Sequence, residues 1–198
     1  MSIFEKALQD GIDIKNRLQE QSFLDTFETM GKILFNTILN EKKIIFCGNG
    51  GSAADAQHLC AELLVRLRPS INRQPIAAIA LAMDTSTITA CGNDFGFKYI
   101  FERNILALGQ KGDALICIST SGNSENINLA AKSAKSLGLV TLGFLGNQGG
   151  DLKNICDYSL IIPSTNTARI QECHITLGHS LMEYLEDNLL EINFLKKS

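Results

Sequence analysis

Histidine and glutamate side chains, which can bind a metal ion or transfer a proton, occur four residues apart at His58 and Glu62. Residues with this spacing lie on one face of a helix. Such a pair can hold a divalent metal ion, or it can set a carboxylate base beside an imidazole. It can equally be a plain surface pair, so the spacing alone leaves all three interpretations open.

A second chemical feature is a run of hydroxyl side chains that follows an apolar segment. Residues 114–118 indicate a strand buried on both faces, and a polar segment at 119–124 comes before helical periodicity begins near Glu125. Hydroxyls, a glycine and the unpaired N–H groups of a first helical turn together suit an anion. The segment has no lysine and is not a nucleotide P-loop. We predict that it binds the phosphate of a small metabolite, the alternative being an ordinary strand-to-helix turn.

A glycine-rich segment at 48–52 follows an expected strand at 43–47 and begins an expected helix at 53–67. It fits Gly-x-Gly-x-x-Ala, the fingerprint of dinucleotide-binding proteins. That fingerprint also requires an acidic residue about 20 positions on, and none is suitably placed. We therefore favour close approach of the backbone to a sugar or its phosphate over a dinucleotide site.

Asn93 and Asp94 lie in a polar segment at 91–96, which we expect to be a loop. Their side chains either contact sugar hydroxyls or only form a structural turn that takes no part in binding. The segment follows an expected strand at 76–82 and comes before a helix expected from about residue 98.

The last helix is expected at 169–190 and carries two histidines. We interpret His174 as a solvated or capping side chain. His179 lies among apolar residues, so on its own it is either a satisfied core histidine or a site residue.

Strand-like segments alternate with helical segments from residue 43 onward. This rhythm predicts a parallel sheet that is covered on both faces and binds ligands outside the carboxyl ends of its strands. Residues 2–39 indicate two helices, hinged near residues 21–22. Because such a pair cannot bury all its apolar surface on a small domain, we expect part of it to form an oligomer interface. The remaining strands are expected at 140–145 and 158–162.

Composition excludes several classes of protein. The 198 residues suffice for one α/β domain, and 45% of them are apolar while 20% are charged. A net charge of −3 argues against a nucleic-acid groove, and no apolar run is long enough to cross a bilayer. The six cysteines are scattered without a Cys-x-x-Cys pair. We expect reduced thiols in a cytoplasmic protein without a signal peptide.

Taken together, these segments resemble the SIS (sugar isomerase) family, and more closely the phosphoheptose isomerase family. The resemblance covers nearly the whole chain in the right order, and it is specific as a set rather than motif by motif. The segments that carry it are 48–52, His58 with Glu62, 92–97, 119–124, and 169–172 with His179.

The resemblance implies a flavodoxin-like fold, with a five-stranded parallel sheet and an N-terminal helical pair. It implies a single SIS domain over residues 1–198, in which residues 1–40 form the oligomerisation helices. It also implies a homotetramer with sites at subunit interfaces, a sugar phosphate as ligand, and neither nucleic acid nor membrane as partner.

The activity implied is conversion of sedoheptulose 7-phosphate to D-glycero-D-manno-heptose 7-phosphate. This is the first step toward ADP-heptose and GDP-heptose, precursors used in lipopolysaccharide biosynthesis. One zinc ion per subunit is implied, held through His58, Glu62, Gln171 and His179. The implied substrate contacts are Asn49, Gly50, Gly51, Ser52, Glu62, Asn93, Asp94, Ser119, Thr120, Ser121, Ser124 and Gln171.

Helix geometry adds a constraint to that ligand set. Gln171 and His179 are eight residues apart, which on one helix is about 12 Å along the axis. Zinc bonds are only about 2 Å long. We therefore expect one of the two residues to reach a given site from a neighbouring subunit, or only one of them to bind metal at a time.

An aldose–ketose conversion needs a base that moves a proton between C1 and C2 of the open-chain sugar. Glu62 is our candidate for this base, and His179 is the candidate acid that handles the oxygen proton. A non-catalytic alternative is a SIS tetramer that binds the replication initiator DnaA. That relative lacks the full metal-ligand set that this sequence contains.

Overall fold

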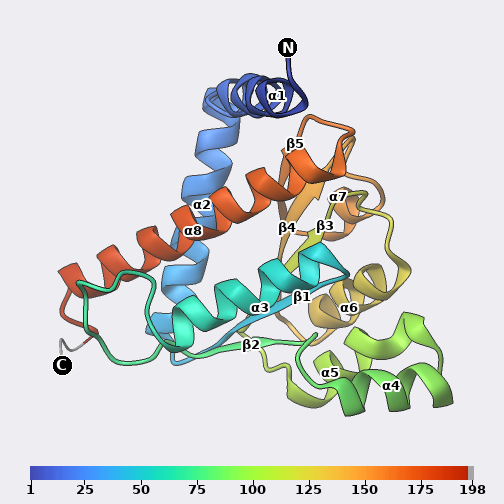
Figure 1. Ribbon diagram of the computed structural model, residues 1–198. Coiled ribbons are helices and arrows are strands. Elements are labelled where there is room, and N and C mark those ends of the chain that lie inside the picture. The colour runs from blue at the N-terminus through green and yellow to red at the C-terminus, as the bar shows by residue number, and fades with distance from the viewer. Residues whose placement is uncertain (196–198) are drawn as a thin grey trace.

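The computed structural model describes residues 1–195 as a parallel sheet between two layers of helices (Figure 1). The strands are β1 (Ile44–Gly48), β2 (Ala78–Ala80), β3 (Ala114–Ser119), β4 (Val140–Gly146) and β5 (Tyr158–Ile162). The helices are α1 (Ile3–Arg17), α2 (Gln21–Leu39), α3 (Gly51–Leu64), α4 (Thr85–Asp94), α5 (Ile100–Leu108), α6 (Glu125–Ser136), α7 (Leu152–Ile155) and α8 (Thr167–Glu191), with a 3-10 turn η1 (Phe97–Tyr99).

The five strands pair in parallel in the order β2-β1-β3-β4-β5. This is the flavodoxin-like order, in which the chain changes direction across the sheet between β1 and β3. In that pair Cys47 is in register with Cys117, so the two strands end at the same edge of the sheet. The α/β fold predicted from the sequence is confirmed.

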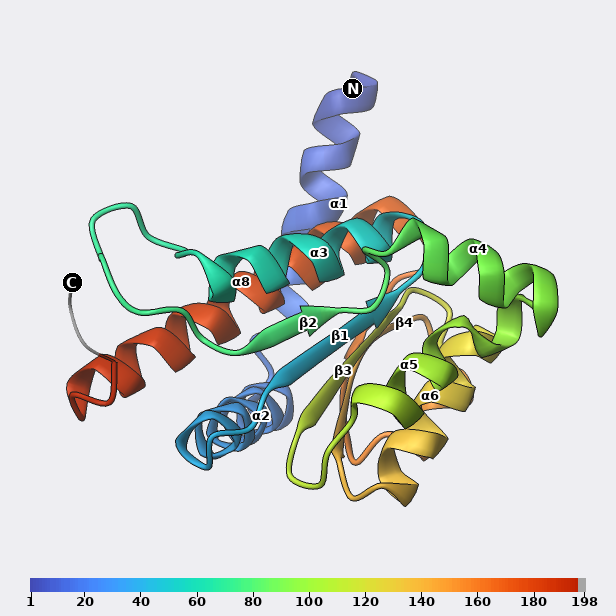
Figure 2. The ribbon, with the colours of Figure 1, turned by 90° about the horizontal axis from the view of Figure 1, so that it is seen from below.

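Alternate side chains of the central strands point into two separate cores. Ile44 and Phe46 of β1 pack in the core formed with α2, α3 and α8, whereas Ile45 and Cys47 pack in the core formed with α5 and α6. Figure 2 shows these two groups of helices on opposite sides of the sheet. Burial on both faces explains why the strands are continuous apolar runs in the sequence.

Most predicted boundaries agree with the structure to within about two residues, and the exceptions have local causes. The edge strand β2 has only three residues rather than the seven predicted. The segment 91–96 is not a loop, because its first four residues form the last turn of α4. Asp84 caps that helix by accepting a hydrogen bond from Ser86, and Gly96 ends the turn with a positive φ of 100°.

The N-terminal helical pair is present, and α1 carries a stripe of exposed apolar side chains. Ile3, Phe4, Leu8 and Ile12 are between 52% and 93% exposed. Figure 2 shows α1 projecting beyond the other helices. The role of this pair in oligomerisation stays a prediction. Among the described residues, no helix is long and apolar enough to cross a bilayer.

Candidate active site

The site is built on α3 and α8, which lie side by side (Figures 1 and 2). A glycine makes their close approach possible: a Cβ placed on Gly178 would lie 2.4 Å from Leu59 Cδ1. Gly178 directly precedes His179, and Leu59 directly follows His58. The contact between the helices therefore brings the two imidazole rings together.

His58, Glu62 and His179 form one cluster of potential ligand atoms. The Nε2 atoms of the two histidines are 2.8 Å apart, and His58 Nε2 lies 3.3 Å from Glu62 Oε1. One ligand atom from each of the three residues lies within 4.8 Å of the other two. The side chain of His58 is 47% exposed while that of Glu62 is 16% exposed, so the cluster opens to solvent on the histidine side.

The donor set suits zinc, which prefers imidazole nitrogen and carboxylate oxygen in tetrahedral geometry. Two ligands of one tetrahedral zinc ion lie about 3.3 Å apart. The contact between His58 and Glu62 matches this separation, and the two histidines need only a small opening to reach it. The fourth member of the predicted ligand set, Gln171, is not part of this cluster.

Asp55 is a residue near this cluster that the sequence interpretation missed. It lies one turn before His58 on α3, and its Oδ2 atom is buried without a hydrogen-bond partner among the described residues. Burial raises the pKa of its carboxyl group, while positive charge on His58 and His179 acts to lower it. The only sequence signal was its three-residue spacing from His58, which places both on one side of the helix.

Gln171 lies at the first turn of α3 rather than beside the histidines. A Cβ on Gly51 would lie 2.3 Å from Gln171 Nε2, whereas His179 contacts His58, seven residues further along α3. Seven residues correspond to about 10 Å of helix. Within one chain, Gln171 and His179 therefore meet α3 at different turns, and zinc binding by Gln171 stays a prediction.

The glycine-rich segment begins α3 directly. Gly50 has a positive φ of 56° and is the N-cap residue of the helix, which starts at Gly51, two residues earlier than predicted. Gly51 is exposed while Ser52 is buried. The N–H groups of Ser52 and Ala53 already donate to the carbonyl oxygens of Asn49 and Gly50. The exposed glycine backbone at 50–51 is therefore the part of this helix N-terminus that could face an anion or a sugar.

The hydroxyl-rich segment forms the predicted turn between β3 and α6. Ser119 Oγ lies 3.5 Å from Ser124 Oγ and accepts a hydrogen bond from the backbone N–H of Gly122 at 3.0 Å. Ser121 Oγ accepts one from the N–H of Asn123. Ser124 is the N-cap residue of α6, yet its side chain makes no capping hydrogen bond. The turn thus presents hydroxyls and helix N–H groups together, as a phosphate site requires.

An amide pair joins these two segments. The side chains of Asn49 and Asn126 donate to one another, with both N–O distances at 2.9 Å. Asn126 is buried and lies in the first turn of α6. The sequence interpretation included Asn49 but missed Asn126, whose position after Ser124 carries no distinguishing signal.

The remaining predicted substrate residues are less closely tied to the cluster. Asn93 and Asp94 are exposed at the end of α4, where Asn93 Nδ2 donates to Asp94 Oδ1 at 2.8 Å. Thr120 is half-buried in the turn after β3. Their part in sugar binding stays a prediction.

The interpretation of His174 as solvated or capping is wrong. Its side chain is fully buried, with Nε2 3.0 Å from the carbonyl oxygen of Leu145. Burial lowers the pKa of His174 to about 4, and the hydrogen bond to Leu145 only partly offsets this effect. The face of α8 that carries His174 packs on the sheet, which the sequence around it could not reveal.

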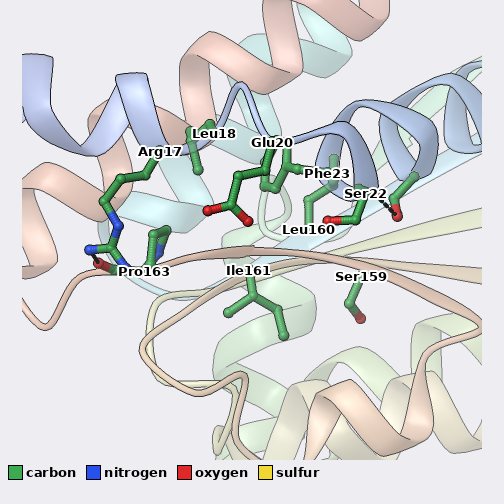
Figure 3. Close-up of a pocket in the computed structure, with 10 residues that line it drawn as sticks. Arg17, Leu18, Glu20, Ser22, Phe23, Ser159, Leu160, Ile161 and Pro163 are labelled. Carbon is green, nitrogen blue, oxygen red and sulfur yellow. Dashed lines mark hydrogen bonds between the residues drawn. The ribbon is translucent and has the colours of Figure 1, made fainter.

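A separate cavity of ≈ 320 Å³ lies between the α1–α2 junction and the edge strand β5 (Figure 3). Arg17, Glu20 and Phe23 line it from the helices, and Ile161 and Pro163 line it from the strand. His58, Glu62, His179 and the segments 48–52 and 119–124 do not line it. This cavity is therefore no part of the candidate active site.

The SIS-domain family model matches residues 9–146, and the parallel sheet with hydroxyl and glycine turns at its carboxyl edge agrees with this class of protein. Among relatives, phosphoheptose isomerase from Clostridium acetobutylicum is 44% identical over 189 residues, covering 95% of each chain. The one from Aquifex aeolicus is 45% identical, covering 94% of this chain and 96% of that one. The chain belongs to the phosphoheptose isomerase family.

Solved structures of the same family agree with this membership. The phosphoheptose isomerase from Francisella tularensis has a TM-score of 0.88 at 35% identity, covering 94% of this chain and all of that one. The phosphoheptose isomerase from Neisseria gonorrhoeae has a TM-score of 0.86 at 36% identity, covering 93% of this chain and 97% of that one.

Proposed function

We propose that this chain is an enzyme that converts sedoheptulose 7-phosphate to D-glycero-D-manno-heptose 7-phosphate. The observation that carries the proposal is the convergence of His58, Glu62 and His179 from two helices far apart in the sequence. Because a non-catalytic DnaA-binding protein needs no such cluster, this convergence disfavours that alternative. The reaction would be the first step toward nucleotide-activated heptose for lipopolysaccharide.

Glu62 is the base that moves the proton between C1 and C2 of the open-chain sugar. Its contact with His58 uses Oε1, so we assign proton transfer to Oε2. At 16% exposure the carboxylate is shielded from most of the solvent, yet it is reachable through the open histidine side. General-base catalysis of this kind contributes about 10²–10⁴ to the rate.

His179 is the acid that handles the proton on the sugar oxygen, from the opposite helix. His58, Glu62 and His179 would hold one zinc ion per subunit, and Gln171 would complete the set from a neighbouring subunit. When bound, zinc supplies Lewis-acid stabilisation of developing negative charge.

The turn at 119–124 would bind the phosphate at the far end of the substrate. Binding energy obtained there is remote from the reacting carbons and serves to fix their position. Asn49 and the glycines that follow it would contact the sugar from the neighbouring turn, with Asn93 and Asp94 as further contacts.

Two wider features complete the proposal. We propose a homotetramer with its sites at subunit interfaces, supported by the exposed apolar stripe on α1 and by the solvent-exposed side of His58. Residues 1–40 would be its oligomerisation helices within a single SIS domain over residues 1–198. We also propose a cytoplasmic location, supported by the six free cysteines.

Substitution of Glu62 by Gln tests the assignment of the base. The amide keeps the shape of the side chain but cannot take up a proton, so turnover should fall at least 100-fold while KM changes little. Formation of the heptose 7-phosphate is followed by NMR, and circular dichroism checks the fold. Wild-type turnover in the folded variant would remove Glu62 from this role, and no product from the zinc-loaded wild type would overturn the proposed function itself.

A further inference from the structure

A fully buried ion pair links the segment that follows α3 to α8. Arg73 Nε donates to Glu186 Oε1 at 2.6 Å, and the two side chains are 0% and 1% exposed. Glu186 Oε2 accepts a second charged hydrogen bond, from Arg68 Nε at 2.7 Å, and Arg68 also pairs with Asp187. None of these residues has a role in the reaction proposed above.

The remaining nitrogens of Arg73 bind main-chain carbonyls. Nη2 donates to the carbonyl oxygen of Glu62 at 2.8 Å, and Nη1 donates to that of Leu63 at 3.0 Å. Nη1 also donates to Gln74 at 3.1 Å. The last carbonyls of a helix have no partner within it, so Arg73 satisfies the end of α3 at the residue whose side chain is the candidate base.

Glu186 follows His179 by seven residues, which is about two turns and places both on one face of α8. A single guanidinium group thus joins the backbone of Glu62 to the helix that carries His179. We propose that Arg73, held by Glu186, is a positioning residue that sets how Glu62 lies relative to His179. The expected effect on catalysis rests on the function proposed above, but the effect on geometry does not.

Stability alone does not account for a charged pair here. Well-packed apolar side chains often stabilise a core as much as a buried ion pair does. The guanidinium adds direction, because its planar fork fixes several hydrogen bonds at once. Lysine at this position retains the charge but cannot hold Glu186 and the carbonyls of Glu62 and Leu63 in the same fixed arrangement.

The test compares Arg73→Lys with Arg68→Lys as a matched control. Both replacements disturb a hydrogen bond to Glu186. Among the described residues, however, the Arg68 side chain donates to Glu186 and Asp187 and not to the backbone of α3, whereas Arg73 donates to both Glu186 and that backbone. We expect Arg73→Lys to lower kcat tenfold or more with KM within twofold, since small misplacement of a catalytic group costs up to about 100-fold. We expect Arg68→Lys to keep kcat within threefold of the wild type.

A spectroscopic readout is independent of turnover. Cobalt(II) substituted for zinc reports coordination geometry through its visible absorption, and we expect this spectrum to change in Arg73→Lys and not in Arg68→Lys. Glu186→Gln serves as a second variant, read by the same criteria, should Arg73→Lys fail to fold. Unchanged kcat and spectrum in the folded variant, or equal changes in the Arg68 control, would overturn the proposal. An inactive wild type would instead contradict the proposed function, and the cobalt spectra would still decide the positioning role.

Discussion

The approach of α3 to α8 can be perturbed by a single methyl group at Gly178. An added Cβ would lie 2.4 Å from Leu59 Cδ1 and 3.0 Å from its Cγ, whereas ordinary contacts begin at 3.4 Å. Leu59 is fully buried, which leaves its side chain little room to change rotamer, so we expect the helices to separate by about 1 Å. The 2.8 Å gap between the two histidines should widen by a similar amount.

We therefore expect Gly178→Ala to destabilise the protein by about 1–3 kcal/mol, as overpacked cores usually do. Turnover should fall by up to about 100-fold, because a shift of about 1 Å displaces His179 from Glu62. Zinc affinity should fall as well, because a widening of about 1 Å overshoots the separation of about 3.3 Å that two ligands of one tetrahedral zinc ion require. Urea unfolding, steady-state kinetics and a zinc-indicator competition assay measure the three effects.

Gly11→Ala is the matched control for this substitution. Among residues 1–195 of the same chain, its Cβ would meet only Glu172 Oε2, at an ordinary 3.8 Å, so turnover and zinc affinity should stay unchanged. Adding Leu59→Ala to Gly178→Ala removes the clashing atoms and should recover part of the zinc affinity. Wild-type zinc affinity and turnover in Gly178→Ala would refute the argument that this contact brings the histidines together.

Two further changes test other parts of the structure. Because the folded-state pKa of His174 is about 4 and the usual value is 6.5, the unfolded chain binds an extra proton as pH falls through this window, and stability is lost. The free energy of unfolding should fall between pH 7.5 and pH 5, and this fall should be about 2 kcal/mol larger in the wild type than in His174→Gln. Urea unfolding at fixed protein concentration measures it. If the stability of the two proteins depended equally on pH, the lowered pKa of His174 would be contradicted. Asn126→Ala removes both hydrogen bonds to Asn49 and should raise KM several-fold more than it lowers kcat, while destabilising by about 1–3 kcal/mol. An unchanged KM would exclude a role for Asn126 in ordering the Asn49 turn for the proposed substrate contact.

The order of strands and helices could be predicted because burial on both faces leaves long apolar runs in the sequence. The last turn of α4 could not, since Gly92, Asn93 and Asp94 are poor helix formers and the turn depends on the packing around it. Likewise the edge strand β2 pairs with β1 over only Ala78–Ala80, and the apolar run at 76–82 does not show where that pairing begins or stops.

Within the site, the sequence indicated which residues lie close together on one helix, but it did not indicate which residues on different helices come into contact. The four-residue spacing of His58 and Glu62 was visible, whereas the contact with His179, 121 residues from His58, depends on tertiary packing at Gly178. His174 and His179 lie on the same helix among apolar neighbours, and only the packed structure separates the core residue from the site residue. Arg73 gave no signal, because its partners are backbone carbonyls and a distant glutamate.

The central claim is that side chains from α3 and α8 form one metal-binding and proton-transfer site. Anomalous diffraction at the zinc edge, from crystals grown with zinc, tests it most directly. The account predicts a peak about 2.0–2.2 Å from His58 Nε2, from a carboxylate oxygen of Glu62 and from His179 Nε2. A zinc ion bound elsewhere, with these three side chains directed into separate cavities, would contradict it.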